Sequence, residues 1–224
     1  LDRFDLDGGS RTRIPLPTLG SLGGLGGEWD GLELFYSFTS FTVPPTVYRY
    51  DLETGNSALW GRVEADLDPR DYEIHQVRCT SRDGTRIPLF VVHRRGLVVD
   101  GQRPTLLTGY GGFEVSLTPG FSRSSFLWLQ SGGVYAVANL RGGGEYGSAW
   151  HQAGRLGNKQ NVFDDFLAAA AWLVEAGYTD PRRLAIMGGS NGGLLVGAAL
   201  TQRPDLFRAV VLSVPLLDML RYHH

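Results

Sequence analysis

The chain has 224 residues and a formal net charge of −2 at pH 7, with 42% hydrophobic and 20% charged residues. This composition is typical of a globular protein and excludes a disordered chain or a coiled coil. The near-neutral charge argues against a protein that mainly coats nucleic acid or an anionic membrane, and no apolar run is long enough for a transmembrane helix.

The first 64 or so residues predict strands and no helix. Runs of β-forming residues occur at 32–38, 46–50 and 57–60, and close turns separate them. Short strands joined in this way suit a propeller blade or a fragment of a β-sandwich. They are too few to close a propeller.

From about residue 65 the pattern changes to strands that alternate with helices. A hairpin is predicted from 72–80 and 86–93 around the turn at 81–84. Buried strands are predicted at 104–108, 133–139, 184–187 and 209–214, and helices at 121–130, 161–176 and 192–202. This alternation predicts an α/β fold with a mostly parallel sheet that is covered on both faces.

The helix at 161–176 has the clearest periodicity. Its apolar residues recur at spacings of three and four, which predicts one buried face made of Phe163, Phe166, Leu167, Ala170, Leu173 and Val174. Two acidic residues, Asp164 and Asp165, are expected to interact favourably with the dipole at the N-terminus of this helix.

Residues 188–192, Gly-Gly-Ser-Asn-Gly, match the pattern G-x-S-x-G between a predicted strand and a predicted helix. In this context the serine lies at a strained turn, and the glycines on either side relieve crowding. The helix behind it directs free N–H groups at the serine, where they favour negative charge. Ser190 is thus a candidate nucleophile, and the backbone N–H of Asn191 is a candidate oxyanion donor.

A second oxyanion donor is expected on the loop after the third strand of such hydrolases. Here that loop is 109–113, and its Tyr110 can donate a phenolic hydroxyl; the alternative is a buried tyrosine in a turn. For the serine motif itself, the alternatives are a plain Gly-Ser turn and a phosphate cradle. Neither the Walker pattern nor a dinucleotide fingerprint after the first strand is present.

For the cysteine and for the histidines that precede the serine, we expect structural roles. Cys79 is the only cysteine, so no internal disulfide can form, and we expect it to lie in the core. The histidines before the serine, His75, His93 and His151, are expected to be packing or surface residues.

Four motifs together resemble the prolyl oligopeptidase family. They lie at 110–113 (Tyr-Gly-Gly-Phe), 141–151 (Arg-Gly-Gly-Gly-Glu-Tyr-Gly, then Trp150-His151), 159–166 (Lys-Gln-Asn-x-Phe-Asp-Asp-Phe) and 188–195 (Gly-Gly-Ser-Asn-Gly-Gly-Leu-Leu). The resemblance implies an α/β-hydrolase with a seven-bladed β-propeller inserted near its start. Residues 1–64 would be the last strands of that propeller. Residues 65–224 would be the N-terminal part of the catalytic domain, incomplete at its C-terminus.

The resemblance also implies an activity and a site. The family cleaves short peptides after proline, with Ser190 as the nucleophile and the Asn191 N–H and the Tyr110 hydroxyl as the oxyanion hole. Phe113 and Leu216 match positions that line the pocket for the proline ring. For 141–147 we expect a structural role, with Arg141 and Glu145 available to pair. No cofactor, metal, nucleic acid or membrane partner is expected, and the location implied is cytoplasmic.

The catalytic acid and histidine of the fold are expected beyond this sequence. They follow the serine in chain order, and only 34 residues follow Ser190. Asp205 and Asp218 come too early, and His223 and His224 do not lie beyond the final strand of the fold. We therefore expect a fragment that is inactive alone and whose partner is the rest of the same protein. An esterase or other acyl hydrolase on the same fold, or a non-catalytic scaffold fragment, stays open as an alternative.

Overall fold

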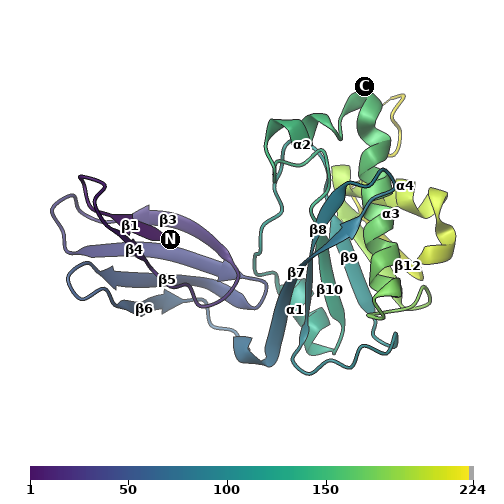
Figure 1. Cartoon of the computed structure of the whole chain (residues 1–224). Helices are drawn as coiled ribbons and strands as arrows, with labels where there is room; N and C mark the ends of the chain where they lie inside the picture. The colour runs from purple at the N-terminus through teal and green to yellow at the C-terminus, as the bar shows by residue number, and fades with distance from the viewer. Residues whose placement is uncertain (222–224) are drawn as a thin grey trace. The chain divides into compact units, whose positions relative to one another are not determined.

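The computed structural model describes residues 1–221 and divides into two compact units. The first unit comprises Leu1–Tyr72 together with Thr118–Phe126, and the second comprises Glu73–Leu117 and the chain from Leu127 onward. Figure 1 labels their helices and strands.

The first unit is built from β-strands. Strands β1 (Asp2–Phe4) and β2 (Arg11–Arg13) form an antiparallel pair. A four-stranded antiparallel sheet has the order β3 (Ser21–Gly26), β4 (Glu33–Ser40), β5 (Val43–Asp51) and β6 (Ser57–Arg62). A short 3-10 helix, η1 (Pro69–Asp71), follows. Four strands of this kind have the size of one propeller blade.

Alternation of side chains explains this sheet. In β4 the side chains of Tyr36, Phe38 and Ser40 are buried, whereas those between them are half-buried. The core of the unit consists of Ile14, Tyr36, Phe38, Val43 and Tyr50. The prediction of strands in this region is confirmed. Strand β3 was not predicted, because three of its six residues are glycines, which are depleted in strands.

The second unit contains a six-stranded mixed sheet. Its order is β12 (Ala209–Ser213), β11 (Leu184–Gly189), β9 (Thr105–Gly109), β10 (Val134–Ala138), β8 (Arg86–Arg94) and β7 (Tyr72–Thr80). Strands β9 to β12 pair in parallel, and β8 is antiparallel to β10. The predicted α/β class with a mostly parallel sheet is confirmed.

In the described chain, the helices that follow β9 lie between these strands in sequence. They are α1 (Arg123–Gln130), α2 (Ser148–Gln152), η2 (Leu156–Asn158), α3 (Lys159–Glu175), α4 (Asn191–Gln202) and η3 (Pro204–Leu206). Helices α3 and α4 pack against each other, and α4 packs on β9, β11 and β12 (Figure 1). The short elements α2, η2 and η3 were not predicted, because single turns leave little periodicity in a sequence.

The core of the second unit lies between the sheet and these helices. Strand β8 is buried at every position from Ile87 to His93, as expected for a strand covered on both faces. Cys79 belongs to the same core, which confirms its predicted role. Burial raises the pKa of its thiol to about 11.

Helix α3 differs from its prediction in start and orientation. It begins at Lys159, so Asp164 and Asp165 do not lie in its first turn. The expectation that both acids interact with the helix dipole was therefore wrong. The buried residues are Val162, Asp165, Phe166, Ala169, Ala170 and Leu173, while Phe163, Leu167 and Val174 are only partly buried. The buried face is thus shifted around the helix, because Asp165 has an ionic partner in the core.

Candidate active site

Ser190 lies between the end of β11 and the start of α4. Its backbone has φ 55° and ψ −118°, a left-handed conformation that is strained for a residue with a side chain. The Ser190 N–H donates to the Ser213 carbonyl at 3.0 Å, and the Ser190 carbonyl accepts from Gly193 N–H at 2.9 Å. The surrounding backbone therefore holds this conformation in place, and it leaves the Ser190 side chain exposed.

Two glycines make this sharp turn possible. A Cβ atom on Gly188 would lie 2.0 Å from the Gly192 carbonyl oxygen, and one on Gly192 would lie 2.9 Å from the Gly109 carbonyl oxygen. Both distances are below any real Cβ contact. The strand, the serine and the helix can approach this closely only because positions two residues before and after Ser190 lack side chains.

The loop that carries Tyr110 reaches the start of α4. Strand β9 ends at Gly109 beside β11, and because the two strands are parallel, the loops after them meet at the same edge of the sheet. The Asn191 side-chain Nδ2 donates to the Tyr110 carbonyl at 2.6 Å. As the first residue of α4, Asn191 also carries one of the N–H groups that have no partner within a helix.

Lys159 joins the same group of residues. Its Nζ donates to the Gly111 carbonyl at 2.8 Å and to Asn191 Oδ1 at 3.2 Å. The Nζ atom also lies 5.9 Å from the centre of the Phe163 ring. Burial lowers the pKa of the Lys159 amine to about 8.

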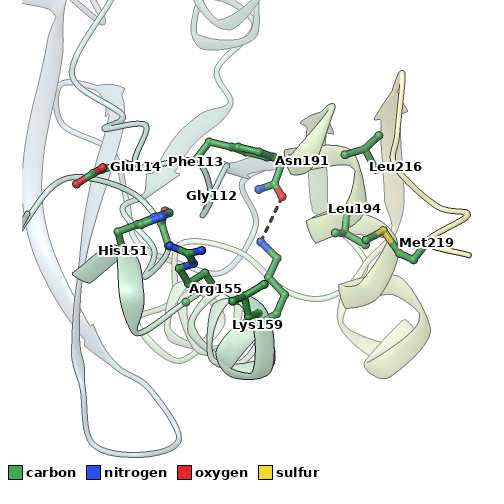
Figure 2. Close-up of a pocket in the computed structure, with 13 residues that line it drawn as sticks. Gly112, Phe113, Glu114, His151, Arg155, Lys159, Asn191, Leu194, Leu216 and Met219 are labelled. Carbon is green, nitrogen blue, oxygen red and sulfur yellow. Dashed lines mark hydrogen bonds between the residues drawn. The ribbon is translucent and has the colours of Figure 1, made fainter. Parts of the chain in front are cut away.

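A cavity of about 550 Å³ opens beside these residues (Figure 2). Its lining comprises Gly112, Phe113, Glu114, Gly142, His151, Gly154, Arg155, Leu156, Lys159, Asn191, Leu194, Leu216 and Met219. Phe113 and Leu216, the two predicted pocket residues, thus line one cavity together with Asn191. The Phe113 side chain is 70% exposed, and its backbone has φ 53°.

Sequence reasoning missed several residues of this cavity. His151, Arg155 and Lys159 lie along one side of it, and Leu194 and Met219 lie near Leu216 (Figure 2). The spacing of four between the three basic residues is a pattern that a sequence can show. Their direction toward the cavity depends on how α2 and α3 pack, which the sequence alone does not fix.

No side chain among residues 1–221 forms a hydrogen bond with the Ser190 hydroxyl. The His151 ring lines the cavity, but its Nδ1 is bonded to the Gly142 carbonyl at 2.7 Å. Asp205 and Asp218 are paired with Arg203 and Arg221, each at 2.7 Å. His223 and His224 lie outside the described residues.

Arg141 and Glu145, which were expected to be available to pair, both hold the loop after β10, although they do not pair with each other. Instead, Arg141 pairs with Asp83 and Asp165, and Glu145 Oε1 accepts from Leu117 N–H and Asn139 Nδ2, both at 3.0 Å. These contacts tie the loop to its neighbours in the second unit.

Three side chains away from the cavity could together contact a metal ion. Glu73 and His75 on β7 and His93 on β8 bring one potential ligand atom each to within 4.8 Å of the others. Glu73 is also paired with Arg95 at 3.1 Å, so a cation would compete with a guanidinium for its carboxylate.

Within the described part of the chain, no helix is long and apolar enough to span a bilayer.

Two family models match the chain. Residues 1–63 match the N-terminal β-propeller domain of prolyl oligopeptidase, and residues 119–224 match the prolyl oligopeptidase family. Among curated relatives, the prolyl endopeptidase of Elizabethkingia meningoseptica is 47% identical over 99% of this chain, and that of Dictyostelium discoideum is 41% identical over all of it.

Solved structures give the same result. A chain from a structural and mechanistic study of two prolyl endopeptidases is 58% identical over 96% of this chain, with a TM-score of 0.87. Prolyl oligopeptidase B from Galerina marginata, bound to a 35-residue substrate, is 36% identical over 98%, also with a TM-score of 0.87. This chain covers 31% and 30% of the two curated relatives and 32% of each of these structures. With both family models and these relatives in agreement, the chain belongs to the prolyl oligopeptidase family.

Proposed function

We propose that this chain is part of a longer serine peptidase that hydrolyses short peptides after proline. Residues 1–64 would be the last strands of its β-propeller, and residues 65–224 the first part of its α/β-hydrolase domain. The observation that carries the proposal is the strained, exposed Ser190 at the start of α4, with the Tyr110 loop bonded to the next residue. The relatives named prolyl endopeptidase support the reaction and the substrate class.

The chemistry follows from the positions of three groups. The Ser190 oxygen attacks the carbonyl carbon of the scissile bond, and its proton passes to a general base. The carbonyl oxygen becomes an anion, which accepts hydrogen bonds from the Asn191 N–H and the Tyr110 hydroxyl. The leaving amine takes a proton as the C–N bond breaks. Water then hydrolyses the acyl-enzyme and releases the proline-ended peptide.

No side chain in residues 1–221 is hydrogen-bonded to the Ser190 hydroxyl, so none of them stands in the position of its general base. In this fold the acid and the histidine follow the serine in chain order. We therefore propose that residues 1–224 alone are inactive and that a triad forms in a protein of the relatives' length. An unactivated serine is a weak nucleophile, so an oxyanion hole alone supplies only a small part of catalysis.

The preference for proline rests on the cavity. Phe113 offers a flat apolar ring and Leu216 a branched apolar side chain, both on the lining of one cavity. A proline side chain is compact and apolar, and it brings no N–H that would need a partner. An esterase on the same fold would not require this apolar pair.

Covalent labelling tests the nucleophile. In the full-length protein, a fluorophosphonate should label Ser190, and Ser190→Ala should lower turnover of a proline-containing fluorogenic peptide by about 10⁶-fold. Ser131→Ala, which changes an exposed serine elsewhere in the same unit, is the matched control and should leave turnover unchanged. An adduct on another residue, or hydrolysis of esters without peptides, would overturn the proposal.

A second assay tests the purified chain of residues 1–224. Serine-dependent turnover at the rate of the full-length protein would show that a base lies within these residues.

Peptide substrates and the rest of the same protein are the proposed partners. A cytoplasmic location, and the lack of nucleic-acid and membrane partners, stay predictions.

A further inference from the structure

Lys159 bridges the two segments that hold the proposed oxyanion donors. Its ammonium group contacts the Gly111 carbonyl on the loop after β9 and Asn191 Oδ1 at the start of α4. The other end of the same amide, Asn191 Nδ2, donates to the Tyr110 carbonyl. Figure 2 shows the lysine extended toward Asn191 from the other side of the cavity. Three hydrogen bonds therefore join 110–111, Lys159 and Asn191 in one network.

The network leaves the proposed donors themselves free. It uses the carbonyls of Tyr110 and Gly111 and the side chain of Asn191, whereas the donors are the Tyr110 hydroxyl and the Asn191 backbone N–H. The fit is also tight, since a Cβ atom on Gly112 would lie 2.5 Å from Asn191 Nδ2. A change at Lys159 would therefore alter where the two donors lie, without removing either.

We propose that Lys159 is a positioning residue that sets the spacing between the two oxyanion donors. The inference rests on the proposed function of Ser190, Tyr110 and Asn191, and it assigns a role that the motif alone does not. Oxyanion donors act only when they lie within hydrogen-bond distance of the position that the anion will occupy. A misplacement of about 1 Å can cost about 10²-fold in rate.

The surroundings of Lys159 favour this role over that of a surface ion pair. Its two hydrogen-bond partners are neutral oxygens, and within residues 1–221 none of its polar contacts is with a carboxylate. A buried amine without a counter-ion does not favour folding by itself. A cation held at such a cost to stability, within a cavity beside a nucleophile, is the pattern expected of a functional site.

A double-mutant cycle in the full-length protein tests the proposal. Lys159→Met keeps a long side chain and removes the donors; it should lower kcat by up to about 10²-fold and change KM less. In a Tyr110→Phe background the same change should cost a clearly smaller factor, because one of the two donors to be spaced is already gone. Gln160→Met, on the exposed neighbour of Lys159 in α3, is the matched control. Equal factors in both backgrounds would overturn the proposal.

A measurement without catalysis separates this inference from the proposed function. Amide hydrogen exchange of residues 110–112 and of Asn191 should become faster in Lys159→Met and stay unchanged in Gln160→Met. Unchanged exchange in Lys159→Met would overturn the positioning role, whatever the activity. Conversely, full activity of Ser190→Ala would refute the proposed function while leaving the exchange result to decide whether Lys159 holds the loop.

Discussion

Arg141 and Asp165 form an ion pair inside the second unit. Arg141 Nη2 lies 2.5 Å from Asp165 Oδ1, and the two side chains are 6% and 0% exposed. Asp165 also accepts from the Ser81 hydroxyl at 2.6 Å, and Arg141 pairs with Asp83 on the hairpin between β7 and β8. The Arg141 guanidinium lowers the pKa of Asp83 to about 2. One arginine thus connects the loop after β10, helix α3 and this hairpin.

Removal of Arg141 should destabilise the second unit strongly. Arg141→Met leaves Asp165 as a buried charge without its partner, which costs about 3–5 kcal/mol. Arg182→Met is the control, because Arg182 is 84% exposed and solvent screens its pair with Asp180, so its loss should hardly change stability. Urea unfolding followed by fluorescence would measure both. Equal midpoint shifts for the two variants would contradict the expectation that the buried ion pair contributes more to stability than the exposed one.

The same ion pair shows how far sequence reasoning reaches in α3. Periodicity identified the helix to within two residues of its start, but it placed Phe163, Leu167 and Val174 on the buried face. The structure buries Asp165 instead. A periodic pattern predicts that a charged residue such as Asp165 is exposed. The partner of Asp165, Arg141, lies 24 residues away in the sequence. Only the packing of the loop against α3 reveals that the charge is compensated.

In the candidate site, too, the sequence predicts some features and not others. The sharp turn at Ser190 was predictable, because a strand, a small-residue turn and a helix follow one another directly in the chain. Lys159 belongs to one of the four motifs, but the motif does not indicate which residues its amine contacts. Its partners are 32 and 48 residues distant, so no local pattern indicates them. Local geometry can be read from local sequence, whereas the contacts between segments require the fold.

Loss of the Tyr110 hydroxyl should reduce the rate of the chemical step. Tyr110→Phe removes one oxyanion donor and little volume, so kcat in the full-length protein should fall by about 10²–10³, or about 2.7–4 kcal/mol, with KM less changed. Steady-state kinetics with a proline-containing peptide would measure this. If KM rises and kcat stays the same, Tyr110 contacts the substrate in its ground state and is not an oxyanion donor.

A methyl group at Gly188 should disrupt the turn around Ser190. The new Cβ would lie 2.0 Å from the Gly192 carbonyl oxygen, so the strand and the helix must move apart. This should lower the free energy of unfolding by about 1–3 kcal/mol or more. Gly157→Ala is the matched control, because a Cβ there meets nothing within 4 Å. We expect Gly188→Ala to lose both stability and fluorophosphonate labelling. Normal labelling of that variant would mean that the turn tolerates the added carbon.

The apolar lining should determine which residue precedes the cleaved bond. Phe113→Ala and Leu216→Ala each remove apolar surface from the cavity, so kcat/KM should fall more for a proline peptide than for a matched alanine peptide. A deleted contact of this size is worth about 1–3 kcal/mol of discrimination. Parallel kinetics on the two peptides would measure the ratio. An unchanged ratio in both variants would place the proline ring elsewhere.

The amine of Lys159 should titrate at an unusually low pH. Burial favours its neutral form and lowers its pKa from 10.5 to about 8. Because Lys159 is the only lysine, protein labelled with ¹³C at the lysine Cε gives one lysine signal, and its shift against pH yields the pKa directly. The other titratable groups on the cavity lining are Glu114, His151 and Arg155, so Glu114→Gln and His151→Gln are the variants that check for their influence.

The contribution of Lys159 to folding stability depends on pH, because its pKa is lower in the folded chain than in the unfolded chain. Between pH 8 and 10.5 the unfolded chain binds more protons at this residue than the folded chain, so the contribution of Lys159 to stability rises with pH across this window. Below pH 8 the lysine is protonated in both states, and its burial opposes folding in full. Lys159→Met should therefore stabilise the fold at pH 7 relative to the parent, and this advantage should shrink toward pH 10. A lysine that titrates near 10.5, with a stability difference between Lys159→Met and the parent that does not change with pH, would show that Nζ is exposed to water.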